Sequence, residues 1–220
     1  NSLRSSYGES HYLCDDWNAE FKFYDFELDL NKSFFKIDNA SILINGIINA
    51  TINGVYKNKL TSSSSNPSFK SSSNNLNLDV FNHLNLVSGL ELKGPSIFFN
   101  RSGRAINISF QNHSMNYSFV SNHFELKNRV LYSSVAHFLM NDTKSSISHP
   151  YVKIKYYEDQ QRIIIDRLHG QRGLNPVRNG FHGLNMFVDR LDINLPDNKC
   201  VFFHFSQGRD VKVLFESDRY

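Results

Sequence analysis

Apolar and charged residues alternate along segment 151–157, and this alternation constrains the fold more than any other feature of the chain. Its sequence is Tyr-Val-Lys-Ile-Lys-Tyr-Tyr, in which Val152, Ile154 and Tyr156 alternate with Lys153 and Lys155. A period of two places these apolar side chains on one face of a β-strand, as in a strand with one buried face. The polar residues 158–161 have the length of a hairpin loop, and the apolar run 162–168 predicts the returning strand.

A second hairpin is predicted near the C-terminal end. Segments 200–206 and 211–215 are rich in aromatic and β-branched residues, and the polar residues 207–210 separate them. Phe203 and Phe205 share one strand face, and the apolar residues of 211–215 share another. Either set is a candidate for the core face of this hairpin.

Shorter alternating or apolar segments recur through the rest of the chain, at 21–30, 34–52, 76–86, 97–99, 106–110 and 117–119. The dipeptides Asn-Gly at 45–46 and 53–54 are typical of hairpin turns. Segment 130–140 has helical spacing of its apolar residues, although a pair of strands fits it nearly as well. Many short strands separated by turn signals favour an all-β protein with a β-sandwich fold.

Length and composition predict a single domain over residues 1–220. The chain is 40% hydrophobic, which is enough to bury a full core, and all-β domains commonly reach this size. Within it, residues 1–17 are polar and predict an irregular N-terminal arm. Residues 62–75 are rich in Ser and Asn and predict an exposed loop, in which Phe69 is the only core-forming residue.

Charge and hydropathy argue against two classes of partner. The formal net charge is +3, with no run of five like charges, whereas nucleic-acid-binding proteins usually carry a dense basic stripe. No apolar segment approaches the 18 residues of a transmembrane helix. We therefore expect neither nucleic-acid binding nor a membrane span in this chain.

The two cysteines, Cys14 and Cys200, are too far apart in sequence to suggest a metal site, which needs clustered ligands. They are either two free buried thiols or one disulfide that ties the N-terminal arm to a late strand. The disulfide requires an oxidising compartment.

Eight glycosylation sequons of the form N-x-S/T favour the oxidising compartment. Their asparagines are Asn31, Asn39, Asn49, Asn100, Asn107, Asn112, Asn116 and Asn141. We expect a glycoprotein that is secreted, displayed at the cell surface or held in an organelle lumen, with the Cys14–Cys200 disulfide formed.

Several short motifs occur in a fixed order. They are Phe-Lys-Phe-Tyr-Asp-Phe at 21–26, Asp-Asn-Ala-Ser-Ile at 38–42, Gly-Ile-Ile at 46–48, Gly-Val-Tyr at 54–56, Gly-Pro-Ser-Ile-Phe-Phe at 94–99, Val-Lys-Ile-Lys-Tyr at 152–156, Leu-Pro at 195–196, His-Phe-Ser at 204–206 and Asp-Val-Lys-Val at 210–213. Their order resembles that of the legume-type (L-type) lectins. The resemblance implies a concanavalin-like jelly-roll β-sandwich that recognises sugars.

The chain departs from these lectins at the positions that bind sugar and metal. Where the family has a sugar-contacting Asp, this chain has Lys93 or Gly94. The segment that matches the family's metal-binding strand is His123-Phe-Glu-Leu, in which only Glu125 is a carboxylate. Calcium needs several oxygen ligands, so we expect no metal, no cofactor and a metal-free binding face. Candidate loops for that face are 53–59, 93–104 and 169–183.

Gly8-Glu-Ser10, together with Asp166 and His169, is similar to the Gly-Asp-Ser and Asp-x-x-His blocks of the SGNH esterases. In that alternative Ser10 is the nucleophile, His169 is the base that Asp166 orients, and an Asn such as Asn100 donates to the oxyanion. The chain would then be an O-acyl ester hydrolase or transferase.

The leading interpretation is a non-catalytic recognition domain that binds glycan or protein without metal. The candidate ligand-binding residues are Tyr56, Lys93, Gly94, Asn100 and Arg104, with Tyr56 as an exposed stacking ring. A structural subunit that binds only neighbouring proteins in a larger assembly is a third possibility.

Overall fold

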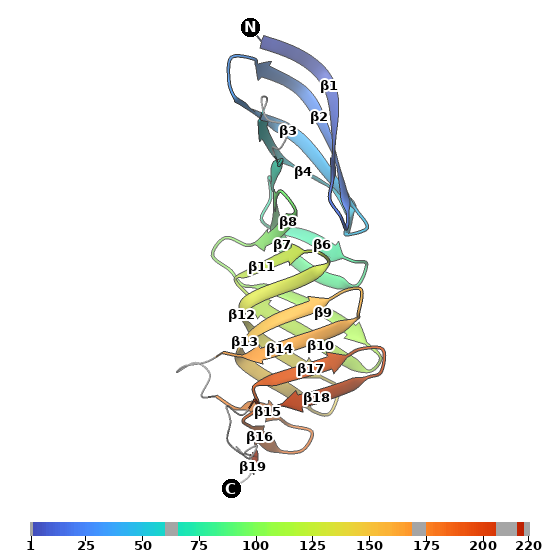
Figure 1. Cartoon of the computed structure of the whole chain (residues 1–220), viewed down its shortest axis with the longest axis vertical. Coiled ribbons are helices and arrows are strands. Elements are labelled where there is room, and N and C mark those ends of the chain that lie inside the picture. The colour runs from blue at the N-terminus through green and yellow to red at the C-terminus, as the bar shows by residue number, and fades with distance from the viewer. Residues whose placement is uncertain (1, 60–65, 169–174, 206–214, 218–220) are drawn as a thin grey trace. The chain divides into compact units, whose positions relative to one another are not determined.

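The computed structural model describes residues 2–59, 66–168, 175–205 and 215–217. Every regular element in these ranges is a β-strand (Figure 1), so the predicted all-β class is confirmed. The described residues contain no helix with the length and apolar character that crossing a bilayer requires. The chain divides into two compact units: unit 1 is residues 1–106 and 125–128, and unit 2 is residues 107–124 and 129–220.

Unit 1 is built from four long strands followed by shorter ones. Its strands are β1 (Ser2–Leu13), β2 (Asn18–Asp29), β3 (Phe34–Asn45), β4 (Ile48–Lys59), β5 (Ser68–Ser71), β6 (Leu76–Val80), β7 (Leu84–Lys93) and β8 (Ser96–Asn100), with the C-terminal part of β11 (His123–Lys127). Strands β1 to β4 pair antiparallel in chain order. Strand β5 pairs with β4 on one side and with β7 on the other. Strands β6, β7 and β8 form a second antiparallel meander.

Unit 2 is also antiparallel. Its strands are β9 (Ile106–Asn112), β10 (Met115–Ser121), β12 (Val130–Asn141), β13 (Ser146–Tyr157), β14 (Arg162–Arg167), β15 (Val177–Asn179), β16 (Leu184–Met186), β17 (Arg190–Asn194), β18 (Lys199–Phe203) and β19 (Phe215–Ser217). One series of pairings joins β10, β12, β13, β14, β17 and β18 in that order. A shorter series joins β13, β15, β16 and β19.

Each unit has its own aromatic core, because alternate residues of its strands point inward. In unit 1, Tyr56 lies 4.8 Å from both Phe21 and Phe23, measured between ring centroids. In unit 2, Phe110 stacks on Tyr117 at 4.9 Å and lies 5.8 Å from Tyr156. Aromatic pairs at these separations add to the free energy gained from burying their area.

The alternation at 151–157 predicted its hairpin correctly. Strands β13 and β14 pair antiparallel around the turn 158–161, with Lys155 opposite Ile164. The Gln161 N–H closes the turn by donating to the Glu158 carbonyl at 3.1 Å. Val152, Ile154 and Tyr156 are all buried, as a period of two requires.

One of the two Asn-Gly dipeptides forms a hairpin turn, and the other does not. Gly46 has a φ of +75° in the turn between β3 and β4, as predicted. The turn predicted at Asn53-Gly54 is wrong, because Gly54 lies inside β4. A Cβ on Gly54 would come within 2.2 Å of the Lys70 carbonyl oxygen and 2.5 Å of the Phe69 ring. Glycine is therefore needed here for close packing of β4 on β5, not for a turn.

Three predictions of irregular or helical structure are also wrong. Residues 2–13, predicted as part of an irregular arm, form β1, which pairs with β2 along its length and so gains a complete ladder despite its polar sequence. Within the predicted loop 62–75, β5 is a strand that buries Phe69, while residues 60–65 lie outside the described residues. Segment 130–140 is neither a helix nor a strand pair but the single strand β12.

The predicted second hairpin is also corrected. Strand β18 pairs with β17, and β19 pairs with β16, so these two strands are not described as partners of each other. Phe203, Phe205 and Phe215 are 38%, 55% and 51% exposed, so none of them belongs to the core. Strand β18 has only β17 as a described partner, and neither of its faces is fully covered. Residues 206–214, which include the predicted loop, lie outside the described residues.

Candidate functional site

Three lysines of unit 1 lie in one row across neighbouring strands. Lys36 of β3 is directly opposite Lys57 of β4, Lys57 is opposite Ser68 of β5, and Ser68 is opposite Lys93 of β7. Residues that are opposite each other in an antiparallel sheet project from the same face. All three lysines are exposed, so this is the solvent face. We call Lys36, Lys57 and Lys93 the lysine row.

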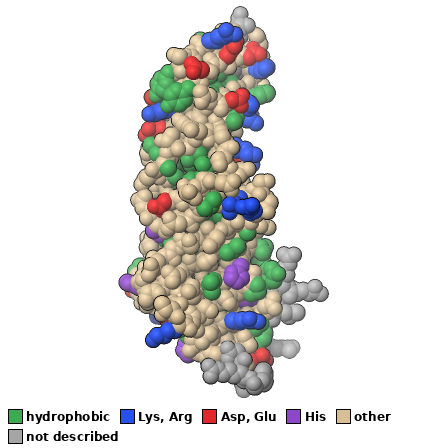
Figure 2. All heavy atoms as spheres, turned by 180° about the vertical axis from the view of Figure 1, so that it is seen from behind, with side chains coloured by type: hydrophobic (Ala, Val, Ile, Leu, Met, Phe, Trp, Pro, Cys, Tyr) green, Lys and Arg blue, Asp and Glu red, His purple; other side chains and the backbone are tan. Residues whose placement is uncertain are grey.

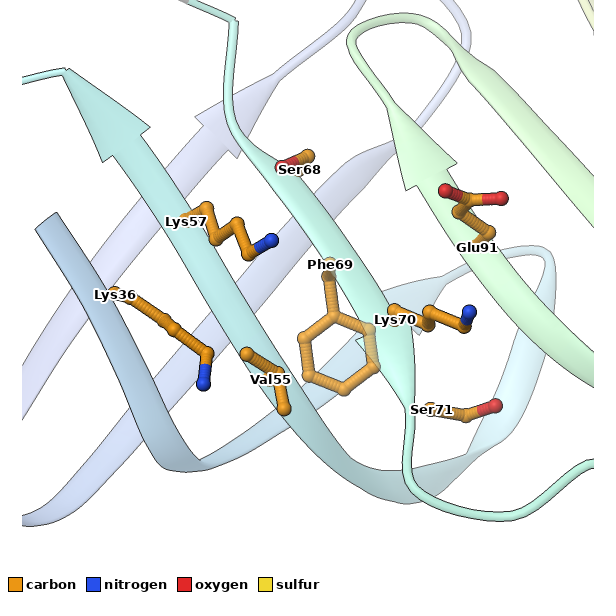
Figure 3. Close-up of a pocket in the computed structure, with 8 residues that line it drawn as sticks. All are labelled: Lys36, Val55, Lys57, Ser68, Phe69, Lys70, Ser71 and Glu91. Atoms are coloured by element: carbon orange, nitrogen blue, oxygen red, sulfur yellow. The ribbon is translucent and has the colours of Figure 1, made fainter. Parts of the chain in front are cut away.

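A hollow of about 240 Å³ opens on this face (Figure 3), and we call it the lysine hollow. It is lined by Lys36, Val55, Lys57, Ser68, Phe69, Lys70, Ser71 and Glu91. In Figure 3, Lys57 extends from β4 toward β5, and Lys70 extends toward the strand that carries Glu91. Phe69 is only 1% exposed and belongs to the core beneath the hollow.

The lysine hollow carries more positive than negative charge. Lys36 forms an ion pair with Asp38, and Lys93 Nζ lies 2.9 Å from Glu91 Oε1. Lys70 stands directly opposite Glu91 of β7, whereas Lys57, among the described residues, has no carboxylate within ion-pairing distance. Like charges directly opposite each other on a sheet destabilise it, and Lys36 and Lys57 are such a pair. An anion bound between them would remove this repulsion.

Two other pairs of charged side chains in unit 1 have opposite signs. Arg4 lies opposite Glu27, and their side chains are 2.9 Å apart. Lys32 lies 3.5 Å from Asp29 in the turn after β2. Figure 2 shows that basic and acidic side chains are interleaved toward the end of the molecule that carries the N-terminus. The direct opposition of Lys36 and Lys57 differs from these pairs, because both of its members are cations.

Unit 2 has a second hollow, about 560 Å³ in volume, whose two carboxylates are both paired with arginines. It is lined by Lys153, Asp166, Arg167, Leu168, Asp189, Arg190 and Phe205, and we call it the ion-pair hollow. Arg190 Nε lies 2.6 Å from Asp166 Oδ1, and Arg167 Nη2 lies 3.2 Å from Asp189 Oδ1. The hydrogen bond from Arg190 to Asp166 raises the pKa of the guanidinium further. Each carboxylate lining this hollow is therefore engaged by a cation.

The predicted ligand-binding residues do not form one site. The expectation that Tyr56 is an exposed stacking ring was wrong, since it is 1% exposed and its hydroxyl accepts a hydrogen bond from Asn58. Lys93 and Gly94 lie at the turn before β8, where Gly94 has a φ of +55°. Asn100 and Arg104 lie at the other end of β8. Of these five, only Lys93 belongs to the lysine row.

The three residues of the alternative esterase triad are placed as follows. Ser10 lies in β1 of unit 1, opposite Phe21 of β2. Asp166 lies in β14 of unit 2, where it accepts the hydrogen bond from Arg190. His169 lies outside the described residues. The structure thus offers no described contact between members of this triad.

The predicted disulfide is absent, because Cys14 and Cys200 are both free thiols. Cys14 lies in the β1–β2 turn of unit 1, where its N–H donates to the Trp17 carbonyl at 3.0 Å. Cys200 lies in β18 of unit 2, opposite Ile193. Burial raises the pKa of Cys200 to about 12, with a smaller contribution from Asp192. Each cysteine is thus held by the pairing of its own hairpin, in a different compact unit.

The sequon asparagines differ in accessibility. Asn31, Asn39, Asn49, Asn107 and Asn116 are exposed, whereas Asn100, Asn112 and Asn141 are half-buried. Asn112 also donates from Nδ2 to the Leu195 carbonyl at 3.0 Å. The five exposed asparagines are the better candidates for modification.

Within the described ranges, no three His, Cys, Asp or Glu side chains gather where they could hold a metal ion. Glu125, the carboxylate retained in the resemblance to lectins, accepts a hydrogen bond from Ser96 at 2.8 Å. Comparison with known proteins finds no matching family model, no matching curated protein and no matching solved structure.

Sequence reasoning missed Lys36, Lys57 and Lys70, which line the lysine hollow. Lys57 falls within segment 53–59, which was expected to be a binding loop but is part of β4. The sequence signal that could have found them is that each lysine occupies a solvent-facing position in a segment of alternating apolar and polar residues. Only the strand register shows that two of these lysines are directly opposite each other.

Proposed function

We propose that this chain is a non-catalytic recognition domain that binds an anionic group of its ligand at the lysine hollow, without metal. The observation that carries the proposal is the direct opposition of Lys36 and Lys57 beside the hollow. A sheet that places two ammonium groups opposite each other loses stability. A bound carboxylate, sulfate or phosphate recovers it.

The size of the hollow supports recognition of one group rather than enclosure of a whole ligand. Its volume of about 240 Å³ lies below the roughly 300–1,000 Å³ of pockets that bury drug-sized ligands. The hydroxyl of Ser68 beside the lysines adds a donor and acceptor for a neighbouring polar group. The rest of the ligand then lies over the open sheet face.

The wider setting of the proposal is a secreted or lumenal glycoprotein with a concanavalin-like jelly-roll sandwich. The all-β content and the five exposed sequon asparagines support this setting. The jelly-roll topology and the likeness to L-type lectins remain predictions. An anion site built from lysines differs from the metal-dependent sugar site that the resemblance implies.

The test is binding to an array of sulfated, carboxylated and neutral glycans in buffer containing EDTA. We expect acidic glycans to be retained and neutral ones not. The double variant Lys36→Gln/Lys57→Gln should lose about tenfold in affinity, which corresponds to two surface charge contacts. The control Lys155→Gln/Lys199→Gln removes two exposed lysines from unit 2 and should bind like the original chain. Equal losses in both variants, or binding that requires calcium, would overturn the proposal.

A further inference from the structure

We propose that the ligand is a linear acidic polysaccharide that lies across the strands of unit 1, with successive acidic groups on the lysine row. This inference rests on the proposed function and adds the class and orientation of the ligand. It follows from the spacing of the charges rather than from the hollow alone.

The lysine row is longer than one anionic group. Neighbouring strands lie about 4.8 Å apart, and the row crosses four strands, from Lys36 on β3 to Lys93 on β7. The Cα positions at its ends are therefore about 14 Å apart, or three strand spacings. A single carboxylate or sulfate cannot contact both ends. A chain with repeated acidic groups can contact Lys36 and Lys57 with one group and Lys93 with a later one.

The position between Lys57 and Lys93 also suits a sugar. Ser68 occupies this position, and its side chain lines the lysine hollow. A hydroxyl both donates and accepts hydrogen bonds, so it matches the hydroxyl groups that separate the charges of an acidic polysaccharide. Lysine ammonium groups are compact charges with rotatable donors. They can follow a flexible chain without the planar geometry that arginine requires.

Two other classes of polyanion fit the row less well. An extended acidic peptide usually adds to a free strand edge, but β5 is already paired with β4 and β7 on its two sides. Single-stranded nucleic acid is bound by stacking its bases on exposed aromatic rings. The ring at the centre of the row, Phe69, is 1% exposed and cannot serve as a platform, and the exposed ring of Phe34 lies only at one end of the row.

The experiment measures affinity by calorimetry for oligogalacturonates of two to eight residues. The same oligomers with methyl-esterified carboxyls are uncharged controls. We expect affinity to rise with length until the row is covered and to vanish on esterification. Lys93→Gln should weaken binding of the long oligomers about threefold and leave the disaccharide unchanged. It should also make the salt dependence of long-oligomer binding shallower by about one charge contact.

The outcomes separate this inference from the proposed function. Binding of charged oligomers with an affinity that does not depend on length would overturn the inference and leave the proposed function standing. If no charged oligomer bound, both the inference and the proposed function would be overturned. Equal affinity for a poly-glutamate peptide or a single-stranded oligonucleotide of matched charge would overturn the choice of polysaccharide. Melting temperatures of the variants, measured in parallel, must match that of the original chain.

Discussion

The solvent faces of the two units use the same cross-strand geometry with opposite electrostatic results. In unit 1, the lysine row contains two like charges, Lys36 and Lys57, that stand directly opposite each other. In unit 2, the corresponding row alternates in sign, because Lys153 is opposite Asp166 and Asp166 is opposite Arg190. A sheet can therefore compensate its surface charges where its sequence supplies the partners. In the lysine row, Lys36 and Lys93 have the carboxylate partners Asp38 and Glu91, whereas Lys57 has none among the described residues.

The ion pairs of unit 2 also link segments that are far apart in sequence. Asp189 accepts from Arg167 at 3.2 Å and from the Phe205 N–H at 2.8 Å, and it lies 2.9 Å from His204 Nδ1. Nearby, the hydrogen bond from Arg162 lowers the pKa of Asp192. These carboxylates act within the fold, whereas Lys57 has no ion-pair partner among the described residues. We interpret the charged face of unit 2 as structural and the lysine face of unit 1 as available for a ligand.

The largest expected effect tests whether a close-packed core lies beneath the lysine hollow. Phe69→Ala removes a buried ring beneath the hollow, 6.2 Å from Phe21. We expect the free energy of unfolding to fall by about 3–5 kcal/mol, because a cavity is left in a close-packed core. Urea unfolding followed by tyrosine fluorescence measures this change.

The neighbouring substitution Lys70→Ala is the matched control, because Lys70 points to solvent from the next position of β5. It should change the free energy of unfolding by less than about 0.5 kcal/mol. If both variants lost the same stability, β5 would not separate a buried face from an exposed one.

The next effect tests the compensated face. The side chains of Asp189, Arg167 and His204 are only 13%, 19% and 18% exposed. Asp189→Asn would leave the Arg167 guanidinium without its counterion. Breaking a fully buried pair costs about 3–5 kcal/mol, so we expect about 2–3 kcal/mol at this partly buried site.

The matched control in unit 1 is Glu91→Gln, which removes the partner of Lys93. That lysine side chain is 59% exposed, so the loss should stay below about 1 kcal/mol. Thermal melting of both variants makes the comparison. A larger loss from Glu91→Gln would mean that the carboxylates of unit 1 stabilise the fold as strongly as those of unit 2.

The sequence predicted the elements of the fold better than the surface they form. Alternation located the β13–β14 hairpin, because each apolar position had to be buried on one face. The Asn-Gly dipeptide signal failed at Gly54, since the approach of the Lys70 carbonyl is a property of two strands and not of the local dipeptide. Alternation failed for Phe205 because it does not say whether a face is covered.

The lysine row could not be predicted for a related reason. A shift of one residue in the pairing of β3 with β4 would place Lys36 opposite a different residue and move its side chain relative to Lys57. The observed register also contains two irregularities, between Ile37 and Ala40 and between Ile42 and Ile44. Sequence alternation does not locate such bulges. The site depends on register, whereas the strands depend mainly on period.

The thiol of Cys200 in unit 2 predicts how the stability of the chain depends on pH. Burial raises the pKa of Cys200 from 9.0 to about 12. A group whose pKa is raised by folding holds its proton more tightly in the folded state. Its contribution to stability is therefore complete below about pH 9 and is lost as the pH rises from 9 toward 12.

We expect the stability of the original chain to fall more steeply between pH 9 and pH 11 than that of Cys200→Ala. Burial raises the pKa of Tyr117 to about 12, with a smaller contribution from Cys200, so Tyr117 acts in the same direction and Cys200→Ala removes part of its effect as well. Urea midpoints at pH 8, 9, 10 and 11 measure the slopes. Thiol titration of the unfolded, unreduced chain should find two free thiols. If it found no free thiol, the Cys14–Cys200 disulfide would be present after all.

The smallest expected effect bears most directly on the lysine row. Lys57→Gln removes one of two ammonium groups that stand opposite each other, so we expect the ligand-free chain to become more stable by a few tenths of a kcal/mol, within the roughly 0.2–1 kcal/mol of cross-strand pairs. Salt screens exposed charges, and the gain should therefore shrink as ionic strength rises from 20 mM to 500 mM. Lys155→Gln in unit 2, an exposed lysine that lies opposite Ile164, should show no gain at either ionic strength. Melting temperatures of both variants at the two ionic strengths make the measurement.

A loss of stability in Lys57→Gln at low salt would show that this lysine already has a stabilising partner, and the charges of the row would then be as well paired as those on the face of unit 2. A gain that disappears when acidic oligosaccharide is added would show that the ligand neutralises the same repulsion.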